Sequence, residues 1–149
     1  MKVHFRNGDI QQYPDDAWNA FIGVLARSPH ELDIEQVPAH LVFVYESEVQ
    51  NGGHLQYFEN GYGGAAAVTV EALRLLHAHR HAAILEEAYA LHLQENRPKS
   101  EAKEEYIAAA LEDRYGQLDA LFGDCEPALI AFLEQHLAER PEPYFDLSE

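Results

Sequence analysis

Basic residues are scarce in this chain, which has 10 Lys and Arg against 26 Asp and Glu and a net charge of −16 with His neutral. A surface this negative repels phosphate, so neither nucleic acid nor an anionic membrane is expected as a direct partner. The same charge would speed association with a cationic protein and make that association sensitive to salt. Many proteins are acidic only for solubility, however, so charge alone does not establish a partner.

Cysteine and long apolar runs are also nearly absent. Cys125 is the only cysteine, which excludes an internal disulfide and a cysteine-rich metal site. No window approaches the roughly 20 apolar residues that a membrane helix needs. The opening residues, MKVHFRNGDI, lack the apolar stretch of an export signal. We therefore expect a cytoplasmic protein.

The residues that are present suffice for a packed core. The chain has 149 residues, of which 47% are hydrophobic, with eight Tyr and seven Phe. A chain of this size usually forms one domain. Apolar residues recur with the helical period in several segments that Gly and Pro separate. The sequence predicts an all-α fold, a single compact multi-helix domain over residues 1–149.

The two ends of the chain carry different signals. Asn7-Gly8 is a strong turn sequence and predicts a short β-hairpin within residues 1–13, packed against helices. Residues 141–149 begin with Pro141 and Pro143 and are expected to form a C-terminal tail whose last six residues, YFDLSE, pack loosely. Helices are predicted from Pro14 to Ser28, from Pro38 to Asn51, from Ala65 to Asn96 with a break near 77–81, from Ser100 to Phe122, and from about 125 to Pro141.

The most distinctive local sequence is NGGHLQYFEN, residues 51–60. Two glycines permit a tight turn of the backbone, amide side chains can bond free groups at helix ends, and the aromatic pair can fill the core. We interpret this segment as a structural corner in preference to a ligand site. Its signature residues are Asn51, Gly52, Gly53, Gln56, Tyr57, Phe58 and Asn60.

Residues 41–64, with YESEVQNGGHLQYFEN followed two residues later by Gly63, resemble the signature of a bacterial domain family of unknown function that includes a DNA-mimic protein. The helical order from about 15 to 140 is similar as well. The resemblance implies an all-helical fold. Its DNA-mimic member implies an acidic surface that occupies the DNA-binding face of a transcription factor.

Acidic residues recur in two places that could form such a surface. Glu101, Glu105, Glu112 and Asp119 follow one another at steps of 4, 7 and 7, which places them near one face of a helix. An i to i+4 step advances about 6 Å along a helix, a spacing of the same order as that of phosphates on a DNA strand. The alternative is a solvated face with local ion pairs. The predicted partner-binding residues are Glu46, Glu48, Glu59, Glu101, Glu105, Glu112 and Asp119.

We therefore expect a protein-binding domain with no catalytic residues, no metal and no cofactor. Its partner would be a basic DNA-binding protein or, if the domain is an immunity-type inhibitor, a toxin nuclease. Sequence does not separate the two. A homodimer built through exposed aromatics, with Tyr62, Tyr144 and Phe145 as candidates, is a further expectation.

The competing hypothesis is a metal-dependent enzyme that uses His77, His81 or His54 with Glu48. Histidines four residues apart on a helix can share one ion, but a closed or catalytic site needs at least three ligands. Arg80 between the two histidines would add repulsion. The lone Cys125 is expected to be a small packed residue, although a helix start beside it could lower its pKa.

Overall fold

The computed structural model describes residues 1–95 and 113–148, and helices dominate this part of the chain. The all-α prediction is confirmed, as is a single compact domain. The elements are β1 (Val3–Arg6), α1 (Asp9–Gln12), α2 (Pro14–Leu25), the 3₁₀ turns η1 (Pro29–Glu31) and η2 (Ile34–Gln36), α3 (Val37–Glu59), the 3₁₀ turn η3 (Tyr62–Ala65), α4 (Ala66–Leu75), α5 (His79–Glu95), α7 (Gly116–Asp124), α8 (Leu129–Glu139) and β2 (Phe145–Ser148).

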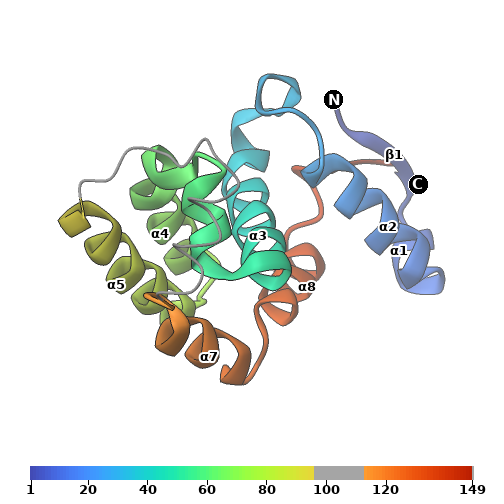
Figure 1. The fold of residues 1–149 in the computed structure, drawn as a ribbon. Coiled ribbons are helices and arrows are strands. Elements are labelled where there is room, and N and C mark those ends of the chain that lie inside the picture. Colours follow the sequence, from blue (N-terminus) through green and yellow to red (C-terminus); the bar gives the residue numbers. More distant parts are fainter. Residues whose placement is uncertain (96–112, 149) are drawn as a thin grey trace.

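Helix α3 lies at the centre of the molecule (Figure 1). It contacts α2, α4, α7 and α8, while α5 contacts α4 and α7. The apolar faces of these helices meet in one continuous core. Its largest fully buried side chains include Tyr45 and Tyr57 of α3, Phe21 of α2 and Leu133 of α8. A domain arranged in this way depends on α3, because most other helices pack against it.

Helix α2 follows its predicted pattern. Pro14 occupies the first turn, where a missing N–H costs nothing. Phe21 and Leu25 are buried, and Trp18 and Ile22 are half-buried on the same face. Asp15 lies in the first turn without capping the helix through its side chain, and its charge there interacts favourably with the helix dipole.

The long helical stretch after residue 65 divides as predicted. Helix α4 ends at Leu75, α5 begins at His79, and His77 between them adopts a left-handed φ of 68°. Arg74 joins the two helices, since its guanidinium lies 2.6 Å from Glu71 and 2.8 Å from Glu86. The predicted helix from Ser100 is described only from residue 113 on, where α7 begins at Gly116. Helix α8 buries Leu129, Leu133 and Leu137 and ends before Pro141, as predicted.

The predicted hairpin within residues 1–13 is wrong. Strand β1 pairs in parallel with β2 from the other end of the chain, in a register from Val3 opposite Phe145 to Arg6 opposite Ser148. Asn7-Gly8 leads from β1 into α1 instead of reversing the strand. Residues 9–12 form helix α1 instead of a returning strand, and the ring of Phe5 packs on that of Phe145 at 4.6 Å.

The expectation of a loose C-terminal tail is also wrong. Tyr144 and Phe145 are 0% and 1% exposed. The Tyr144 hydroxyl hydrogen-bonds His136 Nε2 at 2.6 Å, and buried Gln36 donates to the Pro143 carbonyl at 2.9 Å. These two aromatics are therefore part of the core and unavailable to a dimer interface. Tyr62, the third aromatic considered for that role, is half-buried and stacks on Tyr57 at 5.3 Å.

Among the helices of residues 1–95 and 113–148, none combines the length and the apolar character that a membrane span requires.

If the last strand is part of the core, Phe145→Ala should lower the free energy of unfolding by about 3–5 kcal/mol, the usual cost of removing a buried aromatic ring. Urea denaturation followed by circular dichroism measures this. The matched control is Asp146→Asn, one residue further on and exposed, which should change stability by less than about 0.5 kcal/mol. Equal small effects in both variants would mean that the C-terminal strand does not pack.

Candidate functional site

The glycine pair of the signature breaks α3 into two helical parts. Gly52 has φ −152° and ψ 20°, and Gly53 has φ 72° and ψ −175°. Only glycine adopts the second conformation readily. A Cβ atom on Gly53 would also lie 2.5 Å from Asp119 Oδ2, and one on Gly52 would overlap the side chain of Gln56. The sequence prediction of a helix stop at 51–53 is confirmed, although helical backbone resumes at once.

Asp119 of α7 closes this break. Its Oδ1 accepts a hydrogen bond from the backbone N–H of His54 at 2.9 Å and lies 2.6 Å from His54 Nδ1. The first N–H groups of a helix have no partner within the helix, so the carboxylate acts as a cap for the second part of α3. Asp119 is 36% exposed, whereas His54 is completely buried.

His54 continues the contact into the core, where its Nε2 lies 2.7 Å from the Tyr45 hydroxyl. Because an ionised carboxylate can only accept, Nδ1 of His54 is the donor to Asp119. In the neutral ring Nε2 then accepts the proton of Tyr45. Burial raises the pKa of Tyr45 well above its ordinary value, which keeps that proton in place. Tyr45, His54 and Asp119 form a chain of polar contacts, which we call the Tyr45–His54–Asp119 chain.

A second polar group lies on the outer side of the break. Glu48 Oε2 accepts from Gln56 Nε2 at 2.7 Å and from Asn60 Nδ2 at 2.9 Å. Asn51 Nδ2 in turn donates to Gln56 Oε1 at 3.1 Å. The amide side chains were predicted to bond backbone groups, but they chiefly bond one another and Glu48. Together they tie the two parts of α3 across the glycines.

The aromatic pair of the signature fills the core, as predicted. Tyr57 meets Tyr45 edge-on with ring centroids 5.3 Å apart, and burial raises the pKa of Tyr57 to about 12. Phe58 stacks on His92 of α5 at 4.3 Å with nearly parallel rings. The signature thus fixes the positions of α5 and α7 relative to α3.

The predicted partner-binding acids occupy different environments. Glu48 and Asp119 lie on the two sides of the break and accept hydrogen bonds within the chain. Glu46 and Glu59 are half-buried, and burial raises the pKa of Glu46. Glu101, Glu105 and Glu112 lie outside the described residues. As partner-binding residues, all seven remain a prediction.

Sequence reasoning did not identify His54 and Tyr45 as the polar core of the site. The available signal was a histidine placed directly after the two glycines, in a stretch whose other members are glycine, leucine, amide and aromatic residues and the single acid Glu59. The nitrogens of a buried ring usually have hydrogen-bond partners. The tyrosine nine residues earlier and an acid from another helix supply them.

The histidines of the competing metal hypothesis do not meet. His77 is exposed, and His54 is held between Tyr45 and Asp119. His81 is 1% exposed and packs edge-on against Phe122 and Phe132 at 5.3 and 5.9 Å. Neither ring nitrogen of His81 has a hydrogen-bond partner in the described part of the chain, and burial lowers its pKa to about 4. Within residues 1–95 and 113–148, no group of three or more His, Cys, Asp or Glu side chains could hold a metal ion.

Cys125 is buried as expected. Burial raises the pKa of its thiol, the opposite of the lowering that a helix start could have produced. A thiol in this environment is held in its protonated, less reactive form.

The protein is an acidic helical domain. Its most distinctive motif, residues 51–60, holds the break in α3 in place through contacts within the chain. The chain belongs to a known family: the model of the DMP19-like proteins matches residues 30–140. The match includes the whole of α3 and most of the helical core. Comparison with curated proteins and with solved structures gave no match.

Gly53→Ala should destabilise the domain by about 2–4 kcal/mol, because a side chain there meets both an unfavourable φ and the Asp119 carboxylate. Chemical denaturation gives the change. The control is Gly23→Ala within α2, where a Cβ would meet nothing within 4 Å and stability should rise by about 0.5–1 kcal/mol. A neutral Gly53→Ala would show that the break needs neither glycine geometry nor the approach of Asp119.

His81 should make the domain less stable in acid. Its pKa is about 4 in the folded chain and about 6.5 when exposed, so the unfolded state binds the proton first and stability falls as pH drops from about 6.5 towards 4. Replacing His81 with Leu should remove roughly 1–3 kcal/mol of that pH dependence. Denaturation midpoints at pH 7.5 and 5 measure it, with His79→Leu, an exposed neighbour, as control. Identical pH profiles for wild type and His81→Leu would contradict this assignment.

Proposed function

We propose that this chain is a non-catalytic, cytoplasmic, acidic protein-binding domain that acts as a DNA mimic and occupies the DNA-binding surface of a basic protein such as a transcriptional regulator. Membership of the DMP19-like family supports a binding domain of this kind. The observation that carries the proposal is the net charge of −16, together with the way the acidic side chains are displayed.

Many carboxylates of the described residues face solvent without a partner. Arg74 pairs with Glu71 and Glu86, and Glu31, Asp33 and Glu139 have contacts of their own. A further set of exposed acids makes no hydrogen bond or ion pair within residues 1–95 and 113–148. Free carboxylates can receive Lys and Arg side chains that otherwise bind phosphate. These acids are Asp15, Asp16, Glu87, Asp124, Glu126, Glu134, Glu142 and Asp146.

Not every predicted acid suits this role equally. Glu48 already accepts two amide donors and Asp119 already caps a helix, so a partner would have to compete with these contacts. The proposal therefore gives the contact with the partner to Glu101, Glu105 and Glu112, with Glu46 and Glu59 as neighbours in the sequence of the signature. Glu48 and Asp119 would shape the domain that presents them.

Burial of the Tyr45–His54–Asp119 chain supports a non-catalytic function. The Tyr45–His54–Asp119 chain contains an acid, an imidazole and a hydroxyl, the residue types of a proton relay. Tyr45 and His54 are both completely buried, so a substrate would meet only the carboxylate of Asp119, whose Oδ1 accepts from the His54 backbone. A nucleophile must reach the reacting atom, and the Tyr45 hydroxyl has no such access.

The test starts with capture of the partner from the source cell at low salt, followed by fluorescence anisotropy with the purified partner and its DNA. The domain should displace the DNA, and its affinity should fall steeply as salt rises. The triple variant Glu101→Gln, Glu105→Gln, Glu112→Gln should bind roughly tenfold more weakly at unchanged thermal stability. The control with the same change of charge is Glu31→Gln, Glu71→Gln, Glu139→Gln, whose carboxylates are exposed but already have a partner within the chain.

Each result has a defined meaning. A partner that binds the domain and DNA simultaneously would refute DNA mimicry. Equal weakening by the two triple variants would refute the assignment to Glu101, Glu105 and Glu112. A captured nuclease whose activity the domain blocks would make the function immunity-type inhibition.

A further inference from the structure

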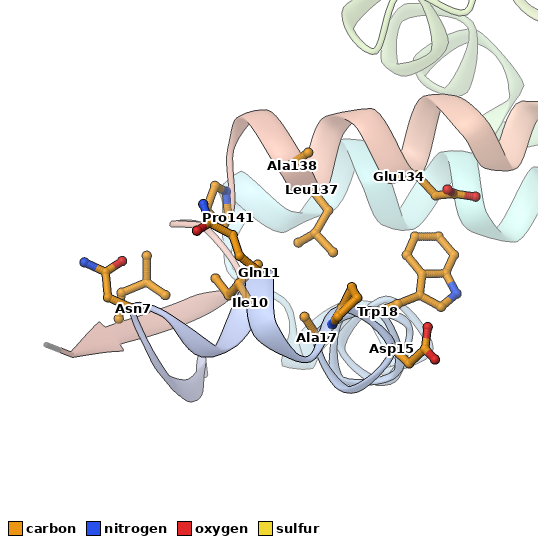
Figure 2. Close-up of a pocket in the computed structure, with 12 residues that line it drawn as sticks. Asn7, Ile10, Gln11, Asp15, Ala17, Trp18, Glu134, Leu137, Ala138 and Pro141 are labelled. Carbon is orange, nitrogen blue, oxygen red and sulfur yellow. The ribbon is translucent and has the colours of Figure 1, made fainter.

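A groove separates the first two helices from the last one. It has a volume of about 610 Å³ and lies between α1–α2 and α8, with β2 at one end. This volume is within the range of roughly 300–1,000 Å³ that is typical of ligand pockets. Figure 2 shows Leu137 of α8 pointing towards the α2 side and the indole of Trp18 extending from α2 towards α8 near Glu134.

The wall of the groove is mainly apolar. Ala17 and Leu137 are buried at its base, while Trp18, Ile10 and Leu147 are half-buried and expose part of their surface to it. Half-buried apolar side chains gathered in a concave surface mark a binding site more often than scattered ones do. The indole of Trp18 adds a flat face that attracts cations as well as apolar groups.

The charges of the lining have one sign. Asp15 and Glu134 are its charged members, and the lining contains no Lys, Arg or His. Both carboxylates are exposed, and neither makes a hydrogen bond or ion pair within the described residues. Figure 2 places Asp15 on α2 and Glu134 on α8, both at the end of the groove where Trp18 lies. An apolar cleft with an acidic end is complementary to a segment that is both apolar and cationic.

We propose that this groove binds a short cationic segment of the partner protein, in which one apolar side chain enters between α2 and α8 while an adjacent Arg or Lys pairs with Asp15 and Glu134. The inference rests on the proposed function, because it takes the partner to be basic. It adds selectivity to that function. A row of carboxylates attracts any cationic protein, whereas a buried apolar anchor beside paired charges discriminates among them.

Trp18 provides the measurement, because it is the only tryptophan of the chain and lines the groove. The probe is a short synthetic peptide with one leucine flanked by arginines. Titration should change the emission of Trp18 in a saturable way and protect it from acrylamide, a neutral quencher that the negative surface does not repel. Two further peptides, one with serine in place of the leucine and one with glutamates in place of the arginines, should bind at least fivefold more weakly.

The variant Asp15→Asn, Glu134→Gln should bind the leucine–arginine peptide roughly tenfold more weakly than wild type at low salt. The matched control, Asp124→Asn, Glu126→Gln, removes the same charge from exposed residues just before α8, away from the groove, and should weaken it by less than about twofold. All four substituted side chains are exposed, so circular dichroism should show unchanged folding for both variants.

The outcomes separate this proposal from the proposed function. Peptide binding without a change at Trp18, or equal weakening by both double variants, would overturn the groove while leaving the acidic surface intact as a general attractor. No binding of any arginine peptide to the intact domain would also overturn the groove. If the whole partner binds wild type and the groove variant equally, the groove proposal fails and the proposed function stands.

Discussion

The cap that Asp119 places on His54 is the contact on which the rest of the structure depends. The glycine pair would otherwise end α3 and leave the N–H groups of the following turn without partners, inside the core. One carboxylate from α7 satisfies the backbone and the imidazole together, and the imidazole carries the contact on to Tyr45. Because α4, α7 and α8 all pack on α3, loss of the Asp119–His54 contact would lower the stability of the whole domain.

The sequence was a good guide wherever local rules decide the structure. Prolines in first turns and apolar residues at helical spacing located α2, the start of α3 and α8. The glycine pair located the break, and the aromatic pair after it entered the core as expected. These features depend on residues a few positions apart, so a single chain displays them.

Contacts between distant residues were much harder to predict. The parallel pairing of β1 with β2 joins opposite ends of the chain, and the turn sequence Asn7-Gly8 pointed to a nearer partner. From its spacing to Glu112, Asp119 was predicted to belong to a row of surface acids. That spacing carries no information about α3, whose His54 Asp119 contacts in the fold. The groove combines residues of α1, α2, α8 and β2, and no sequence pattern links them. Charge was plain from composition, yet only the fold separates carboxylates with internal partners from those that face solvent.

The pairing of β1 with β2 has a consequence for how the chain acquires its structure during synthesis. The strand that begins at residue 3 cannot find its partner until residues 145–148 have left the ribosome. Joining the two ends closes a loop that is nearly as long as the chain, a step with a high entropic cost that follows more local contacts. Helices α2 to α5 can pack together earlier, whereas the ring of Phe5 remains without its partner Phe145. The fold is thus completed only when residues 145–148 pair with β1, and until then Val3 and Phe5 lack their apolar partner Phe145.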